Sequence, residues 1–143
     1  MHRTGSILAL LGTGLLAGGM LFFSAVMAPL VFTRLPMDVA GPFIRTAFPF
    51  LYAYCLATSG VALLGYALRR SRAALVPGVI MLCTLWSWLW MLPRLDALRV
   101  AGNHAAFARG HFLSTWVFGL ELALALWRLG HEGIKRHSQS QAG

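Results

Sequence analysis

Glu121 is the residue of this sequence whose type and position most directly suggest chemistry. It is the single charged side chain in the apolar stretch Gly110–Trp127. A carboxylate is costly in an apolar surrounding unless it is paired, protonated or hydrogen-bonded, so such a residue is a functional hypothesis by default. Two interpretations are open. Glu121 is either structural, reaching the polar boundary or accepting hydrogen bonds from a neighbouring helix, or it handles a proton or a substrate.

Two cysteines form a second candidate site, for a soft metal. Cys55 and Cys83 lie near the middle of separate apolar stretches, where Met20 or Met81 could complete a Cu(I) site with them. The alternative is that both thiols are small buried apolar groups. A haem held by two histidines is not favoured, because the first three apolar stretches contain no histidine. We therefore expect no cofactor, with Cys55 and Cys83 as weak metal candidates.

The third candidate is a group of polar residues at the ends of the apolar stretches. If four helices alternate in direction, the end of the first and third and the start of the second and fourth meet at one end of the bundle. This polar rim comprises Arg34, Asp38, Arg45, Arg94, Asp96, His111 and Ser114. It is either a cap of ion pairs or a site for an anion or lipid headgroup, since a guanidinium binds a carboxylate or phosphate through two parallel hydrogen bonds.

The composition indicates that lipid surrounds the elements that hold these residues. Of 143 residues, 58% are hydrophobic and 11% are charged, whereas soluble domains carry roughly 25% charged residues. The net charge of +8 does not indicate nucleic-acid binding, because the basic residues lie between the apolar stretches and at the C-terminus and form no basic face. In those positions they flank anionic headgroups, so membrane lipids are the expected partners.

Four stretches almost free of charge predict the fold: Gly5–Thr33, Thr46–Leu68, Ala73–Pro93 and Gly110–Trp127. A helix of about 20 residues spans a hydrocarbon core of ~30 Å, and continuous apolar stretches exclude the alternating pattern of a membrane β-barrel. We predict an all-α, integral membrane four-helix transmembrane bundle in one domain, 1–129, with helices at about 6–32, 43–68, 73–92 and 107–128. The remaining segment, 130–143, is expected to be a polar, disordered tail.

Small residues, aromatic residues and charges suggest packing and orientation. Gly14 and Gly18 form a GxxxG pair, which allows close packing inside the bundle or formation of a homo-oligomer. The 12 basic residues divide seven to five in favour of the side that holds both termini, which predicts cytoplasmic termini. An interfacial aromatic belt on the other side is indicated by Trp86, Trp88, Trp90 and Trp116.

Four segments are more specific than a generic membrane protein: APLVFTRLP (Ala28–Pro36), AGPFIRTAFPFLYAY (Ala40–Tyr54), LPRLDALR (Leu92–Arg99) and FARGHFLS (Phe107–Ser114). In this order and spacing the sequence resembles the transmembrane protein 205-like family, whose bacterial members are classed as a domain of unknown function (family 4149). The resemblance covers about Ile7–Trp127. It departs from the family's pattern at Thr33, where arginine is frequent, and at Phe118, where asparagine is frequent. The resemblance implies a multipass membrane protein and brings no agreed activity, substrate or cofactor.

These features favour a small multipass protein of the bacterial inner (plasma) membrane with a transporter-like, lipid-interacting or accessory role. The sequence contains no Gly-rich phosphate loop, HExxH, CxxC or nucleophile elbow, which favours a non-enzymatic role without deciding the question. The alternative is a haem- or copper-handling membrane redox protein.

Overall fold

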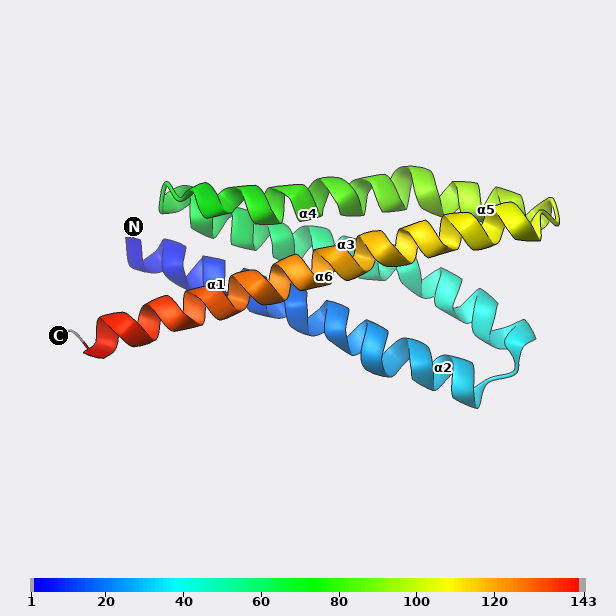
Figure 1. Ribbon diagram of the computed structural model, residues 1–143, viewed down its shortest axis with the longest axis horizontal. Helices are drawn as coiled ribbons and strands as arrows, with labels where there is room; N and C mark the ends of the chain where they lie inside the picture. Colours follow the sequence, from blue (N-terminus) through cyan, green and yellow to red (C-terminus); the bar gives the residue numbers. More distant parts are fainter. Residues whose placement is uncertain (1, 142–143) are drawn as a thin grey trace.

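The part of the chain that the structure describes is built from helices (Figure 1). The computed structural model describes the backbone of residues 2–141 and the side chains of residues 3–134, and this part of the chain contains no β-strand. The elements are α1 (His2–Phe22), η1 (Phe23–Met27), α2 (Ala28–Arg34), α3 (Met37–Leu68), η2 (Arg72–Ala74), α4 (Leu75–Trp86), η3 (Ser87–Met91), α5 (Leu92–Val100) and α6 (His104–Gln141). The predicted all-α fold is confirmed.

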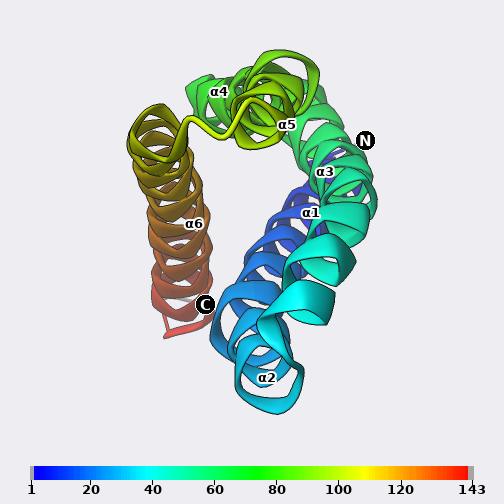
Figure 2. The same ribbon diagram turned by 90° about the vertical axis from the view of Figure 1, so that its right-hand side faces the viewer.

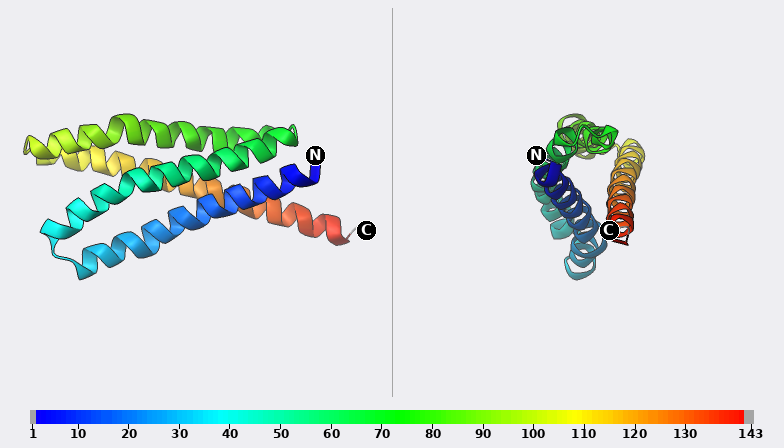
Figure 3. Two further views of the ribbon diagram at one scale, coloured as in Figure 1. Left: turned by 180° about the vertical axis from the view of Figure 1, so that it is seen from behind. Right: turned by 90° about the vertical axis from the view of Figure 1, so that its left-hand side faces the viewer.

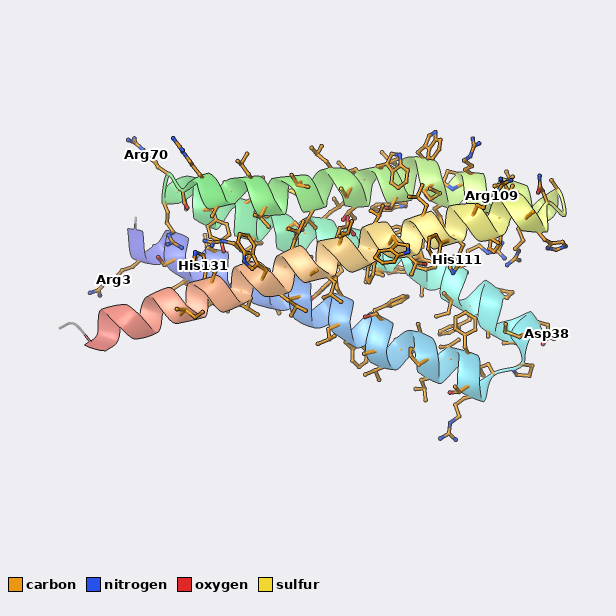
Figure 4. All side chains as sticks on the ribbon, in the orientation of Figure 1. Arg3, Asp38, Arg70, Arg109, His111 and His131 are labelled. Atoms are coloured by element: carbon orange, nitrogen blue, oxygen red, sulfur yellow. The ribbon has the colours of Figure 1, made fainter. Side chains whose placement is uncertain are left out.

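The helices form four spans that are long and apolar enough to cross a membrane: Arg3–Arg34, Met37–Leu68, Arg72–Val100 and His104–Ile134. Both termini and the α3–α4 turn lie at one end, which we call the terminal end (Figure 1). The α2–α3 and α5–α6 turns lie at the other, the rim end. Figure 4 shows Arg3, Arg70 and His131 towards the terminal end and Asp38, Arg109 and His111 towards the rim end.

Each span is longer than the apolar stretch that predicted it. The spans contain 29 to 32 residues, which at ~1.5 Å per residue exceeds a ~30 Å hydrocarbon core. Polar residues continue the helices because headgroup water can solvate their side chains while the backbone stays hydrogen-bonded. At the rim end only a short turn joins α5 to α6. In that turn Gly102 has φ of 68°, and the Asn103 side chain accepts a hydrogen bond from the Ala106 amide at 3.1 Å.

The C-terminal segment also differs from the expected disordered tail. Helix α6 continues to Gln141. Arg128 and Glu132 form an ion pair one turn apart on this helix, and such pairs support helical structure. The helix therefore extends beyond the point where the apolar stretch ends.

Helices α1 and α3 form the most extensive contact, and they lie side by side when seen from behind (Figure 3). Their approach depends on small residues spaced seven apart on α1, namely Gly5, Gly12 and Gly19. A Cβ atom at Gly12 would lie 2.8 Å from the Ala62 Cα and 2.9 Å from the Thr58 carbonyl oxygen. Close backbone approach of this kind is how helices associate in lipid, where no hydrophobic force acts between them.

The GxxxG pair of α1 lies outside this tight contact. A Cβ atom at Gly18 would meet nothing within 4 Å among the described residues, and one at Gly14 would meet Leu129 of α6 at 3.9 Å. The tight contact between α1 and α3 therefore forms at Gly5, Gly12 and Gly19, which are spaced seven residues apart. A role of Gly14 and Gly18 in an oligomer stays a prediction.

The first and third spans each contain a π-helical turn that is followed by a proline. In η1 the Ala28 amide donates to the Phe23 carbonyl, and in η3 the Leu92 amide donates to the Ser87 carbonyl. Proline has no N–H, and its ring crowds the carbonyl four residues earlier, so a wider turn before Pro29 and Pro93 accommodates it. The two helical hairpins of the bundle thus carry the same distortion in their first helix, and π turns are frequent at functional sites.

Candidate functional site

A cavity of about 300 Å³ lies inside the rim-end half of the bundle. All four spans contribute to its wall. The first span contributes η1 and α2, the second contributes α3, the third contributes η3 and α5, and the fourth contributes α6. Ligand pockets in proteins have volumes of roughly 300–1,000 Å³. The cavity is therefore large enough for a small ligand or part of a larger one.

Aromatic rings form one side of the cavity. Phe23 packs against Phe48 with ring centroids 5.6 Å apart, and Phe48 stacks on Tyr52 at 5.7 Å. The row continues behind the cavity wall, where Tyr52 meets Trp88 at 6.3 Å. This row of rings crosses from η1 through α3 to η3, so each π turn contributes one ring to it. Phe118 of α6 adds a ring from the opposite side, and such a wall suits an apolar occupant.

Three of the hydroxyl groups on the wall donate to their own helices. Ser24 donates to the carbonyl oxygen four residues before it at 2.9 Å, and Ser114 and Thr115 both donate to the His111 carbonyl oxygen at 2.9 Å. Because these donors are already used, they add little polarity to the cavity. The imidazole of His111 also lines the cavity and stacks on Phe107 with ring centroids 5.9 Å apart.

The cavity opens sideways between the first and fourth spans. Helix α1 packs against α6, whereas α2 diverges from α6 towards the rim end (Figures 1 and 2). Lining residues on both sides of this opening are exposed, among them Ser24, Phe32 and Thr115. In a bilayer this opening faces lipid, so an occupant can enter from the hydrocarbon core.

Glu121 lies beside the cavity, one helical turn beyond the lining residue Phe118. Its side chain is 4% exposed, and its Oε1 accepts a hydrogen bond from Thr84 Oγ1 at 3.1 Å. Two lining residues, Ser87 and Phe118, lie one helical turn from Thr84 and Glu121, and a third, Tyr52, lies within electrostatic range of the carboxylate. Of the two structural possibilities, Glu121 accepts a hydrogen bond from a neighbouring helix and does not reach the surface of the bundle. A role with a proton or substrate stays a prediction.

The two cysteines lie close to the same layer. Cys55 and Cys83 are free thiols within electrostatic range of Glu121; the first is buried and the second half-buried. Cys55 packs in the central apolar cluster with Met20 and Ile80, as expected for a small apolar side chain. Among the described side chains, no group of three or more His, Cys, Asp and Glu residues could hold a metal ion.

The polar rim lies at one end of the bundle, but its members do not converge on one point. Arg45 and Asp96 form an ion pair between α3 and α5, with 3.2 Å between Nε and Oδ1. Arg94 does not join this pair, because its guanidinium lies over the Trp90 ring, 5.0 Å from the centroid. Arg34 is exposed at the end of α2. The rim therefore contains one capping ion pair and separate arginines.

The remaining rim residues have different surroundings. Asp38 lies in the first turn of α3, where a carboxylate interacts favourably with the helix dipole. His111 and Ser114 belong to the cavity wall. These two therefore face the cavity, whereas none of the rim arginines lines it.

A buried charged cluster at the terminal end was not predicted from the sequence. Glu132 is 3% exposed, accepts hydrogen bonds from Arg69 at 3.1 and 3.2 Å, and forms an ion pair with Arg128. The two guanidiniums lie 5.8 and 4.8 Å from the centroid of the Tyr66 ring. The Tyr66 hydroxyl lies 3.4 Å from Thr13 Oγ1, so this Glu132 cluster connects α1, α3 and α6. The available sequence signal was the four-residue spacing of the pair on α6.

Comparison with known proteins identifies one family. No curated protein and no solved structure matches the chain significantly. A family sequence model matches residues 11–104, a range that includes both π turns, Thr84 and the Arg45–Asp96 pair, whereas Glu121 and Glu132 lie beyond it. Because this match covers more than half of the 143 residues, the protein belongs to the family described as Domain of unknown function (DUF4149).

Proposed function

We propose that this protein is a lipid-binding membrane component that takes the apolar chain of an amphiphile into the cavity between its four spans. The observation that carries the proposal is the cavity itself. It has a volume of about 300 Å³, and residues from every span line it. An accessory or transporter-like role would use this same binding step.

The chemistry of the wall supports an amphiphilic occupant. Aromatic and aliphatic side chains bind a hydrocarbon chain through dispersion contacts, while the hydroxyls of Ser24, Ser114 and Thr115 are occupied by their own helices. His111 lies towards the rim end (Figure 4). The Arg45–Asp96 pair joins the rim-end portions of α3 and α5, where the spans reach headgroup depth. Polar groups at that depth offer partners to a polar head.

The proposal includes a location and a finer family assignment. We place the protein in the bacterial inner membrane as a multipass component with cytoplasmic termini, on the seven-to-five distribution of basic residues. The transmembrane protein 205-like assignment is supported by segments such as Ala28–Pro36 and Leu92–Arg99, which contain the prolines that follow the two π turns. A homo-oligomer is compatible with the exposed position of Gly18.

The test compares two alanines of the first span. Ala28 lines the cavity, whereas Ala25 is exposed outside it. Full-length protein is purified in mild detergent, and the lipid that co-purifies is quantified by mass spectrometry. Ala28→Phe should reduce the bound amphiphile about tenfold, which corresponds to ~1.4 kcal/mol, because the added ring fills the space. Ala25→Phe should retain the wild-type amount.

Melting temperatures of both variants separate loss of ligand from loss of fold. A folded Ala28→Phe protein with the wild-type amount of lipid would contradict the proposal. An equal loss in Ala25→Phe would show that the lipid was bound on the outer surface of the bundle.

A second candidate function is favoured by the burial of Glu121 beside the cavity. A carboxylate inside a membrane span is costly, and such residues commonly mark proton or substrate pathways. Glu121 would then handle a proton or the polar part of the occupant. By contrast, no observation on the described residues favours a haem- or copper-handling redox function.

A further inference from the structure

A groove on the outer side of the bundle, between α5 and α6, carries two arginines. Its volume is about 310 Å³, and it is lined by Arg94 of α5, Arg109 of α6 and apolar residues that include Trp90 and Leu113. None of its lining residues is acidic. The groove is distinct from the cavity between the four spans. Met91 and Leu95 form part of the wall between them, since both residues line the groove and the cavity.

The two guanidiniums are available to an external anion. The guanidinium carbon of Arg94 lies over the Trp90 ring, 5.0 Å from its centroid, a contact with the ring that uses none of the N–H donors of Arg94 in a hydrogen bond to an acceptor. Asp96, only two residues away, is already paired with Arg45. Among the residues that the structure describes, neither Arg94 nor Arg109 has an ion-pair partner. Two cations thus face one groove without a counter-charge from the protein.

The depth of the groove matches the boundary between acyl chains and headgroups. Trp86 and Trp90 stack with ring centroids 5.5 Å apart, and tryptophans concentrate at the membrane interface. Arg94 lies one turn beyond Trp90 towards the rim end, and Arg109 lies in the second turn of α6. The cationic part of the groove is therefore at headgroup level, with its apolar part directed towards the hydrocarbon core.

We propose that this groove binds an anionic phospholipid, with the phosphate held between Arg94 and Arg109 and an acyl chain along Trp90 and Leu113. A planar guanidinium can donate two parallel hydrogen bonds to phosphate oxygens, and an ammonium cannot reproduce this geometry. The apolar lining provides the contact that a free phosphate ion would not use. The site is independent of the amphiphile bound in the cavity.

The test is a titration of delipidated full-length protein with phosphatidylglycerol, monitored by native mass spectrometry. Arg94→Gln and Arg109→Gln should each weaken binding about tenfold, as expected for loss of a charge-assisted contact. Arg94→Lys should also bind more weakly than the wild type. Arg99→Gln is the matched control, because it removes an exposed arginine at the same end of the bundle and should bind within about twofold of the wild type.

Several outcomes would overturn this assignment. An equal loss in Arg99→Gln would indicate general charge attraction, and unchanged binding by both groove variants would exclude the groove. Inorganic phosphate that competes as well as the lipid would indicate a simple anion site, and equal binding of phosphatidylcholine would contradict anionic selectivity. Ala28→Phe should leave this titration unchanged, so failure of the cavity proposal and failure of the groove are distinguishable. If Arg94→Gln does not fold, Arg109→Gln decides alone.

Discussion

Nη1 of Arg69 donates hydrogen bonds to both carboxylate oxygens of Glu132, at 3.2 and 3.1 Å, although 63 residues separate the two in the sequence. Arg128 contacts the same carboxylate from one turn earlier on α6. These contacts hold α3 and α6 together at the terminal end. At the rim end, by contrast, α2 and α6 diverge around the cavity (Figure 2). Ion pairs with Glu132 therefore join the helices at the terminal end of the bundle, whereas the cavity separates them at the rim end.

Glu132→Gln should strongly destabilise the protein. The substitution leaves Arg69 and the 5%-exposed Arg128 close together without a counter-charge, and breaking a buried ion pair typically costs about 3–5 kcal/mol. Unfolding in mixed micelles, followed by circular dichroism, measures the change. Arg70→Gln, which alters an exposed arginine of the same turn, should stay within ~0.5 kcal/mol of the wild type. A Glu132→Gln protein as stable as this control would mean that water already solvates the cluster.

Gly12→Leu should destabilise the α1–α3 contact, whereas Gly18→Leu should not. A side chain at position 12 would overlap the backbone of α3, while position 18 faces open space. Overpacking typically costs about 1–3 kcal/mol, so the Gly12→Leu protein should melt at a lower temperature. The Gly18→Leu protein should melt near the wild-type temperature, and a change in its oligomer size would assign Gly18 to a contact between copies. Equal melting of the two proteins would contradict the observed helix contact.

The four spans could be predicted from the sequence because their cause is simple. An apolar stretch long enough to cross a hydrocarbon core must hydrogen-bond its backbone groups internally, and a helix does this within one segment. The ends of the helices could not be predicted in the same way, since charged residues such as the exposed Arg94 and Arg99 continue a helix once headgroup water solvates them. The π turns also escaped prediction, although Pro29 and Pro93 are their visible cause.

The polar sites were predictable in part. Glu121 was recognisable because a carboxylate stands out in an apolar stretch, but its partner Thr84 is 37 residues away and depends on how α4 meets α6. Alternation of the spans predicts that the rim residues share one end of the bundle, but the pairing of Arg45 with Asp96 depends on helix rotation. Glu132 resembled a solvated tail residue, because nothing local indicates that Arg69 lies beside it.

Reporter fusions should place the terminal end in the cytoplasm. The prediction rests on the positive-inside rule and on the cluster of arginines in the α3–α4 turn. Fusions at the C-terminus and after Arg70 should give a cytoplasmic signal, and a fusion at Gly102 should give the opposite signal. A cytoplasmic signal at Gly102 would reverse the orientation and place the opening of the cavity in the other leaflet.

The hydrogen bond between Thr84 and Glu121 separates a structural from a chemical role of the carboxylate. Thr84→Val removes the donor and leaves the carboxylate buried, which should cost about 1–3 kcal/mol. Replacing both partners, as in Thr84→Val with Glu121→Leu, should recover most of this loss, because removal of a buried polar pair can be nearly neutral. Thermal melting of the two proteins in detergent measures the difference. Melting of the double variant as low as the single one would mean that Glu121 has further essential contacts.

Glu121→Gln tests the chemical role directly. The amide keeps the shape of the side chain and can still accept the hydrogen bond from Thr84, but it cannot release a proton. If Glu121 handles a proton, vesicles that contain the wild-type protein and a trapped pH-sensitive dye should lose an imposed pH gradient faster than vesicles with Glu121→Gln. The Glu121→Gln protein should melt no lower than the wild type, because burial of a neutral amide in an apolar surrounding costs less than burial of a carboxylate. Equal dissipation by the two proteins, above that of protein-free vesicles, would exclude Glu121 from the proton path and leave it as the acceptor that joins α6 to α4.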